Sequence, residues 1–277
     1  MRKMQNHLHF NSLGSTNVHL KQMVESSEKG LEALFTITAD QQENGRGRQQ
    51  KTWESECGKN LLMSVLLYPQ YPPQKQFYVC RYVSLALVDF LQELLQDTSK
   101  NTRHCGLDPQ SPCRLGIPHQ VRNDECTKNV YIKYPNDIYI GNQKVAGILI
   151  EHFLQGEKIN YSIAGIGLNV NQAVFPAHLP NPTSIFLETN KEFSPFFCME
   201  KIVENIKELS AYKPAVLEQK YEEFLYKKDE YATFLIPQQS DIPIVAKING
   251  VIENGLLHLS DTENNSFFVA VNEIVYL

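Results

Sequence analysis

The chain has 277 residues, of which 42% are hydrophobic and 21% are charged, a composition typical of a globular protein with a sizeable core and about one or two domains. Its net charge of −5 and pI near 5.9 argue against broad nucleic-acid binding, which requires a basic face. The N-terminus lacks the apolar segment of a signal peptide, and no run approaches the ~18 apolar residues of a membrane span. We therefore expect a cytoplasmic protein that binds neither nucleic acid nor membranes.

The N-terminal region predicts a strand followed by a helix. Leu8 and Phe10 indicate a short strand, and Ser15 or Thr16 is a natural N-cap for a helix that extends to about Ser26. Taken alone, the run Ser15-Thr16-Asn17 is explained by capping and needs no further role.

A polar stretch from Gln41 to Trp53 separates two apolar runs, Leu34–Ala39 and Asn60–Tyr68, which we interpret as buried strands. The stretch is predicted to be a loop. Gly45 and Gly47 allow close approach of the backbone to a ligand, and Arg46, Arg48 and Lys51 supply three cations, which suits an anionic group such as a phosphate. A solvated connection without a ligand is an equally good interpretation of these residues alone.

The middle of the chain predicts helices that cover an antiparallel sheet. Apolar residues recur at helical spacing from Phe77 to Leu95, whereas Ser99 to Lys128 has no periodicity and several prolines, so we interpret it as a surface insertion. Segment Ser194–Leu225 is predicted to be helical, with a break at Pro214. Four strand-like runs lie between, with Gly141-Asn142 as a hairpin turn: Val130–Lys133, Ile138–Ile140, Lys144–His152 and Tyr161–Val170.

The last part of the chain changes to short strands. From about Glu230, the pairs Asn249-Gly250, Asn254-Gly255 and Asn264-Asn265 predict turns, and tight hairpins at that spacing favour a small, partly open barrel. We therefore expect an α+β fold in two domains, 1–229 and 230–277, in which a mixed, mostly antiparallel sheet is covered by helices.

Four motifs together resemble the biotin protein ligase family. The loop Gln41–Trp53 is similar to the family's Gly-Arg-Gly-Arg-x-Gly-Arg-x-Trp signature, and Lys133–His152 is similar to Lys-Trp-Pro-Asn-Asp followed by Lys-x-x-Gly-Ile-Leu. The runs Ser15-Thr16-Asn17 and Gly165-Ile-Gly-Leu-Asn169 are further matches, so the resemblance extends from about residue 8 to about residue 190. It implies a class II synthetase-like biotin/lipoate ligase domain followed by a small SH3-like β-barrel.

The resemblance also implies an activity. Such enzymes form biotinyl-5′-AMP from biotin and ATP with Mg²⁺, and then pass biotin to a lysine of a biotin carboxyl carrier protein domain, such as that of acetyl-CoA carboxylase. The segment before the first motif is too short for the helix-turn-helix domain of ligases that act as repressors, so the monofunctional form is expected. The family includes monomers and homodimers, which leaves homodimerisation open.

The matched motifs imply roles for individual residues. The expected catalytic residues are Arg46, Arg48 and Lys144, whose cations would reduce repulsion between the biotin carboxylate and the α-phosphate. Asp137 would hold the nucleotide and its Mg²⁺, whereas Asn136 is explained equally well as part of a turn. The expected biotin contacts are Ser15, Thr16, Asn17, Gln42, Gly45, Arg46, Lys144, Gly147 and Ile148, and the expected nucleotide contacts are Arg48, Trp53, Lys133, Asn136, Asp137 and Asn169.

The chain departs from the family pattern at two places. Gln50-Lys51 replaces the usual Gly-Arg, and Tyr134 replaces the tryptophan of Lys-Trp-Pro-Asn-Asp. Two other interpretations stay open: a lipoate protein ligase, which would share the fold and the adenylation chemistry, and a non-catalytic biotin-sensing or interaction protein.

Overall fold

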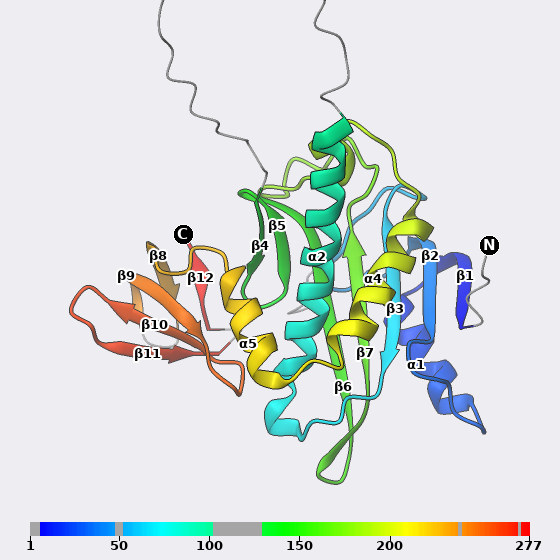
Figure 1. The fold of residues 1–277 in the computed structure, drawn as a ribbon, viewed down its shortest axis with the longest axis horizontal. Helices are drawn as coiled ribbons and strands as arrows, with labels where there is room; N and C mark the ends of the chain where they lie inside the picture. The colour runs from blue at the N-terminus through cyan, green and yellow to red at the C-terminus, as the bar shows by residue number, and fades with distance from the viewer. Residues whose placement is uncertain (1–5, 48–51, 102–128, 238–239, 271–272) are drawn as a thin grey trace, which may run out of the picture.

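The computed structural model describes residues 6–47, 52–101, 129–237, 240–270 and 273–277. Its larger sheet has the strand order β1-β2-β3-β7-β6-β5-β4 (Figure 1). Strands β1 and β2 pair in parallel, and all other neighbours in this sheet are antiparallel. The strands are β1 (His7–Leu13), β2 (Thr36–Gln42), β3 (Leu61–Leu67), β4 (Val130–Lys133), β5 (Asp137–Ile140), β6 (Gln143–Gln155) and β7 (Lys158–Leu168). The predicted mixed, mostly antiparallel sheet is confirmed.

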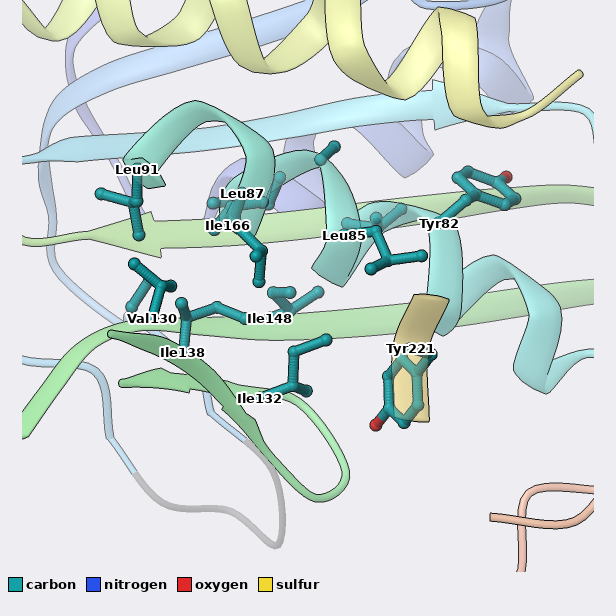
Figure 2. Packing of buried hydrophobic residues seen from close by; sticks show 14 of the residues in the cluster. Tyr82, Leu85, Leu87, Leu91, Val130, Ile132, Ile138, Ile148, Ile166 and Tyr221 are labelled. Carbon is teal, nitrogen blue, oxygen red and sulfur yellow. The ribbon is translucent and has the colours of Figure 1, made fainter. Parts of the chain in front are cut away.

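Two long helices cover one face of this sheet. Helices α2 (Phe77–Asn101) and α4 (Pro195–Leu209) lie side by side over it (Figure 1). Figure 2 shows Leu85, Leu87 and Leu91 of α2 among Ile148 of β6 and Ile166 of β7. Burial of each such side chain contributes about 1.5–3 kcal/mol, so this layer holds the fold together.

The other helices are short. They are α1 (Thr16–Ser26), α3 (Ile185–Thr189), α5 (Pro214–Glu223) and the 3₁₀ helix η2 (Pro73–Lys75). Pro214 occupies the first turn of α5, where the missing N–H costs nothing, so the expected break in the helical segment is confirmed. Helix α1 packs against β2, β3 and β7, where its Leu20 meets Ile37 and Leu66 in a second, smaller core.

A second sheet follows α5. Its order is β11-β10-β9-β8-β12, and all pairs are antiparallel. The strands are β8 (Tyr231–Ile236), β9 (Ser240–Val251), β10 (Leu257–Asp261), β11 (Ser266–Val269) and β12 (Val275–Tyr276). This arrangement agrees with the expected small β unit. The boundary between residues 229 and 230 stays a prediction, since one buried cluster includes Phe234 and Leu259 of this sheet together with Leu85 of α2.

Buried Arg81 joins the two parts of the molecule. Its Nη2 donates to the carbonyl oxygens of Val251 at 2.7 Å and Ile252 at 3.1 Å, at the end of β9. Its Nη1 lies 3.2 Å from a carboxylate oxygen of Glu218 on α5. Because only 1% of Arg81 is exposed, these bonds fix α2, α5 and the second sheet relative to one another.

Several predicted boundaries were wrong. The second strand begins at Thr36, because Leu34 has a left-handed backbone with φ of 65°, and it continues through Gln42, two residues into the expected loop. Helix α2 includes residues 99–101 of the expected insertion; residues 102–128 lie outside the described part of the chain.

One predicted turn was also wrong, whereas two others are confirmed. Asn249-Gly250 lies inside β9, and a Cβ on Gly250 would be 2.5 Å from Oε1 of Glu222, so this glycine serves a close approach. The expected turns at Asn254-Gly255 and Asn264-Asn265 are present, with positive φ at Gly255 and Asn264.

Candidate functional site

A cavity of about 510 Å³ lies on the face of the larger sheet opposite α2 and α4. Ile148 and Ile166 point toward α2 in Figure 2, so their neighbours Gly147, Gly165 and Gly167 face the other way, into the cavity. Segments far apart in the sequence meet here: the start of α1, the end of β2, the β5–β6 hairpin, the loop after β7 and residues 274–276, which include β12 of the second sheet.

Two paired glycines form a floor without side chains, and Trp53 covers it. Gly147 and Gly167 are directly opposite each other on β6 and β7. A Cβ on Gly167 would lie 2.4 Å from Cε2 of Trp53, and a Cβ on Gly147 would lie 3.0 Å from Cζ3. The indole Nε1 is buried and has no hydrogen-bond partner among the described residues. The Trp53 ring is therefore the group that lies closest to both glycines.

One end of the cavity is built from neutral polar side chains. Ser15 is the N-cap residue of α1, but its side chain makes no capping hydrogen bond. The backbone N–H of Thr16 donates to Oε1 of Gln42 at 2.7 Å, and Oγ1 of Thr16 lies 3.0 Å from the same oxygen. Asn17 lies over Gly165, where a Cβ would be 2.3 Å from Oδ1 of Asn17. The glycine is therefore required for the position of this amide.

The other end is charged. Nζ of Lys144 lies 2.7 Å from Oδ1 of Asp137, and about a third of each side chain is exposed. Lys133 donates to the hydroxyl of Tyr139 at 3.3 Å, and its Nζ lies 4.6 Å from the ring centroid of Tyr276. Burial raises the pKa of Tyr139 to about 12, so this phenol is neutral at pH 7. The site can therefore place ammonium groups beside an anionic ligand.

The loop cations are more exposed. Arg46 lines the cavity, and its Nη2 is 3.9 Å from Oε1 of Glu151, with 48% of the arginine side chain exposed. An ion pair of this kind contributes little to stability, so Arg46 is free to exchange its partner for a ligand. Arg48, Gln50 and Lys51 lie outside the described residues.

The structure brings most of the expected site residues together. Those that line the cavity are Ser15, Thr16, Asn17, Gln42, Arg46, Trp53, Lys133, Asn136, Asp137, Lys144, Gly147, Ile148 and Asn169. Gly45 is not among the cavity-lining residues. Its carbonyl oxygen accepts the backbone N–H of Trp53 at 3.0 Å.

Three of these residues have structural contacts of their own. The side chain of Ile148 packs in the core under α2 (Figure 2). Asn136 lies in the turn before β5 and donates its side-chain amide to the carbonyl oxygen of Ile148. Asn169 donates to the carbonyl oxygen of Thr183 at 2.9 Å and so holds the loop that forms one wall.

Sequence reasoning missed four residues that shape the site. Ser64 lies beneath Thr16 and is fully buried. The sequence sign of this residue was a polar side chain in the otherwise apolar run Leu61–Leu67. Glu151 accepts from Nδ2 of Asn17 at 2.8 Å and lies within the recognised segment Lys133–His152. Phe175 and Tyr276 line the cavity from segments without any motif, so no local pattern could identify them.

Known proteins share this sequence pattern and fold. Residues 10–169 match the model of the biotin/lipoate A/B protein ligase family. The bifunctional ligase/repressor BirA of Bacillus subtilis is 30% identical over 136 residues, which are 49% of this chain and 32% of that protein. The biotin–[acetyl-CoA-carboxylase] ligase of Paracoccus denitrificans is 29% identical over 171 residues, 60% of this chain and 58% of that protein. The matched region is thus about a third of the Bacillus protein.

Solved structures agree over nearly the whole chain. The biotin protein ligase of Aquifex aeolicus in complex with biotin and ATP superposes with a TM-score of 0.70 at 22% identity and covers 98% of both chains. The Leishmania major enzyme in complex with biotinyl-5-AMP gives a TM-score of 0.58 at 19% identity, over 96% of this chain and 99% of that chain. Both the large sheet and the small C-terminal sheet therefore belong to a known fold.

Proposed function

Because the chain belongs to the biotin/lipoate A/B protein ligase family, we propose that it activates biotin with ATP and transfers the biotinyl group to a lysine of an acceptor protein. One observation carries the proposal: a single cavity has a neutral hydrogen-bonding end at Thr16 and Gln42 and a charged end at Lys144 and Asp137. The first end suits a cyclic urea, and the second suits a carboxylate beside a phosphate.

The first step joins two anions. A carboxylate oxygen of biotin forms a bond with the α-phosphorus of ATP, the bond to the bridging oxygen breaks, and pyrophosphate leaves with the electron pair. Lys144 lies at the charged end and would move its ammonium from Asp137 toward the two reacting groups. Arg46, and Arg48 from the adjoining segment, would neutralise further oxygens. Fixed cations in a site shielded from water lower this barrier by several kcal/mol.

The second step needs no further activation. The lysine amine of the acceptor forms a bond with the acyl carbon, AMP leaves with its electron pair, and the amine loses a proton. We infer a biotin carboxyl carrier domain as acceptor, since the Paracoccus relative is named for acetyl-CoA-carboxylase. The availability of ATP and carboxylases favours the cytoplasm. No described helix combines the length and apolar character needed to cross a membrane.

The nucleotide would occupy the wall formed by Trp53, Lys133, Asn136, Asp137 and Asn169. Within the described residues, no three acidic, histidine or cysteine side chains form a metal cluster. The single carboxylate of Asp137 nevertheless suits Mg²⁺, which is commonly held by one or two carboxylates and the phosphates of its nucleotide. When bound, Mg²⁺ would neutralise phosphate charge.

Pyrophosphate release tests the proposal. The purified protein is mixed with ATP and biotin, with ATP and lipoate, or with ATP alone. We expect release that depends on biotin. Release that depends on lipoate would identify a lipoate ligase, and absence of release in all three mixtures would favour a non-catalytic binding protein.

A further inference from the structure

The ammonium group of Lys133 contacts two tyrosine rings that come from different parts of the chain. Its Nζ lies 5.2 Å from the ring centroid of Tyr139 on β5 and 4.6 Å from the ring centroid of Tyr276 on β12. It also donates to the hydroxyl of Tyr139 at 3.3 Å. Both ring distances fall within the ~6 Å over which an aromatic face attracts a cation. A residue of the second sheet therefore helps to orient Lys133.

The second sheet fixes the place of Tyr276. Tyr276 pairs with Phe234 of β8, and the N–H of the next residue, Leu277, donates to the carbonyl oxygen of Thr233 at 3.1 Å. The ring of Tyr276 also packs against the fully buried ring of Phe234, with 5.1 Å between the two centroids. The Tyr276 ring is thus held in place by the fold itself, without a ligand.

A second contact ties the turn after β4 to the same sheet. Tyr134 directly follows Lys133, and its hydroxyl donates to the carbonyl oxygen of Gly255 at 2.6 Å. Gly255 lies in the turn between β9 and β10, and only 4% of Tyr134 is exposed. Because a buried hydrogen bond anchors the neighbouring residue, the separation of Lys133 from Tyr276 is set by the packing of the two sheets.

Both phenols that contact Lys133 stay neutral at pH 7. Burial raises the pKa of Tyr139 to about 12, and it also raises the pKa of Tyr276. Each ring therefore offers Lys133 its electron-rich face and not a negatively charged oxygen. Since a neutral ring orients an ammonium group without cancelling its charge, that charge stays available to an anionic ligand in the cavity.

We propose that Tyr276 is a positioning residue for nucleotide binding: its ring holds the ammonium group of Lys133 in place before ATP enters. This inference rests on the proposed function, in which Lys133 contacts the nucleotide, and it gives the second sheet a part in that contact. Lys133 and Tyr276 both line the cavity. Ordering a long, flexible side chain costs free energy on binding, and a contact that already exists reduces this cost.

The variants Tyr276→Leu and Tyr276→Phe separate the ring from its hydroxyl. Leucine removes the aromatic face, whereas phenylalanine keeps it. We expect Tyr276→Leu to bind ATP about 5-fold more weakly than the unaltered protein, and Tyr276→Phe to stay within about 2-fold of it, on the scale of one cation–π contact. Titration calorimetry with an ATP analogue that has a methylene group between the α- and β-phosphorus measures binding without reaction. The affinity for biotin should not change in either variant.

Two controls separate positioning from a general structural effect. Tyr212→Leu removes a comparable contact outside the cavity, where Nζ of Lys220 lies 5.7 Å from the Tyr212 ring centroid, and it should leave the affinity for the analogue unchanged. In a Lys133→Met background, Tyr276→Leu should weaken binding no further, because the ring has no ammonium group to hold.

Two results would overturn the role of the Tyr276 ring. One is an equal loss of affinity in Tyr276→Leu and Tyr276→Phe, which would assign the effect to the hydroxyl. The other is a loss in Tyr276→Leu that is the same with and without Lys133. Failure of the proposed function would look different: the unaltered protein would bind the analogue and yet release no pyrophosphate from ATP and biotin.

Discussion

Replacement of Lys144 by methionine should abolish most of the adenylation activity and leave the fold intact. The ion pair with Asp137 at 2.7 Å is about a third exposed on both sides, so its loss should cost only about 0.5–1 kcal/mol of folding free energy. Methionine retains the apolar stem of lysine. The reaction, however, loses a fixed cation, and loss of such a group typically reduces the rate by about 100-fold or more, or roughly 2.7 kcal/mol.

The assay is biotin-dependent pyrophosphate release at saturating ATP, combined with a thermal melt of the same sample. Lys201→Met is the matched control, since Lys201 also pairs with a carboxylate, Glu204 at 3.5 Å, but lies on α4 on the other face of the sheet. This control should retain full activity. A near-normal rate in Lys144→Met with an unchanged melting curve would show that Lys144 does not stabilise the reaction.

Three further changes have defined outcomes. Gly167→Ala would put a methyl group 2.4 Å from Trp53 and displace the ring from its buried position, so the fluorescence emission of this single tryptophan should shift to the red and become easier to quench. Gly14→Ala is the control: its nearest atom lies at 3.9 Å, so neither the emission nor the quenching should change. Burial lowers the pKa of His152 from 6.5 to about 4. The unfolded state therefore takes up the proton first, and the free energy of unfolding should fall as the pH drops from 6.5 to about 4. In His152→Gln, the free energy of unfolding measured in urea should depend less on pH over this range. Arg81→Met would leave buried acceptors without a donor, and its urea midpoint should report a loss of about 3–5 kcal/mol; an unchanged midpoint would refute the role of Arg81 in joining the two sheets.

The fold was largely predictable because local signals agreed with the final structure. The apolar run Leu61–Leu67 forms a buried strand, Gly141-Asn142 forms the expected hairpin, and Pro214 begins a helix as expected. Asn249-Gly250 misled because an Asn-Gly pair is a strong local turn signal, whereas here the glycine allows a distant side chain, Glu222, to approach β9. No local pattern reports that contact.

Site residues were predictable from the sequence where they fall in motifs, and residues outside the motifs were not. Thr16, Lys144 and Gly147 fall in recognised motifs and line one cavity. Ser64 is the opposite case: its importance depends on the register that places it opposite Gly165, which becomes visible only when the strands are paired. Tyr276 reaches the cavity through the packing of the second sheet and lies more than a hundred residues from the last motif. Contacts between residues so far apart in the sequence are set by tertiary structure.

Formation of biotinyl-5′-AMP is the step on which the proposed function depends. A single turnover with excess enzyme, biotin and ATP labelled at the α-phosphate, followed by chromatography of the quenched mixture, measures this step directly. Labelled biotinyl-5′-AMP should appear with the unaltered protein, should form about 100-fold more slowly with Lys144→Met, and should disappear when a biotin carboxyl carrier domain is added. Label that remains entirely in ATP, with biotin bound to the protein, would contradict the proposed ligase activity.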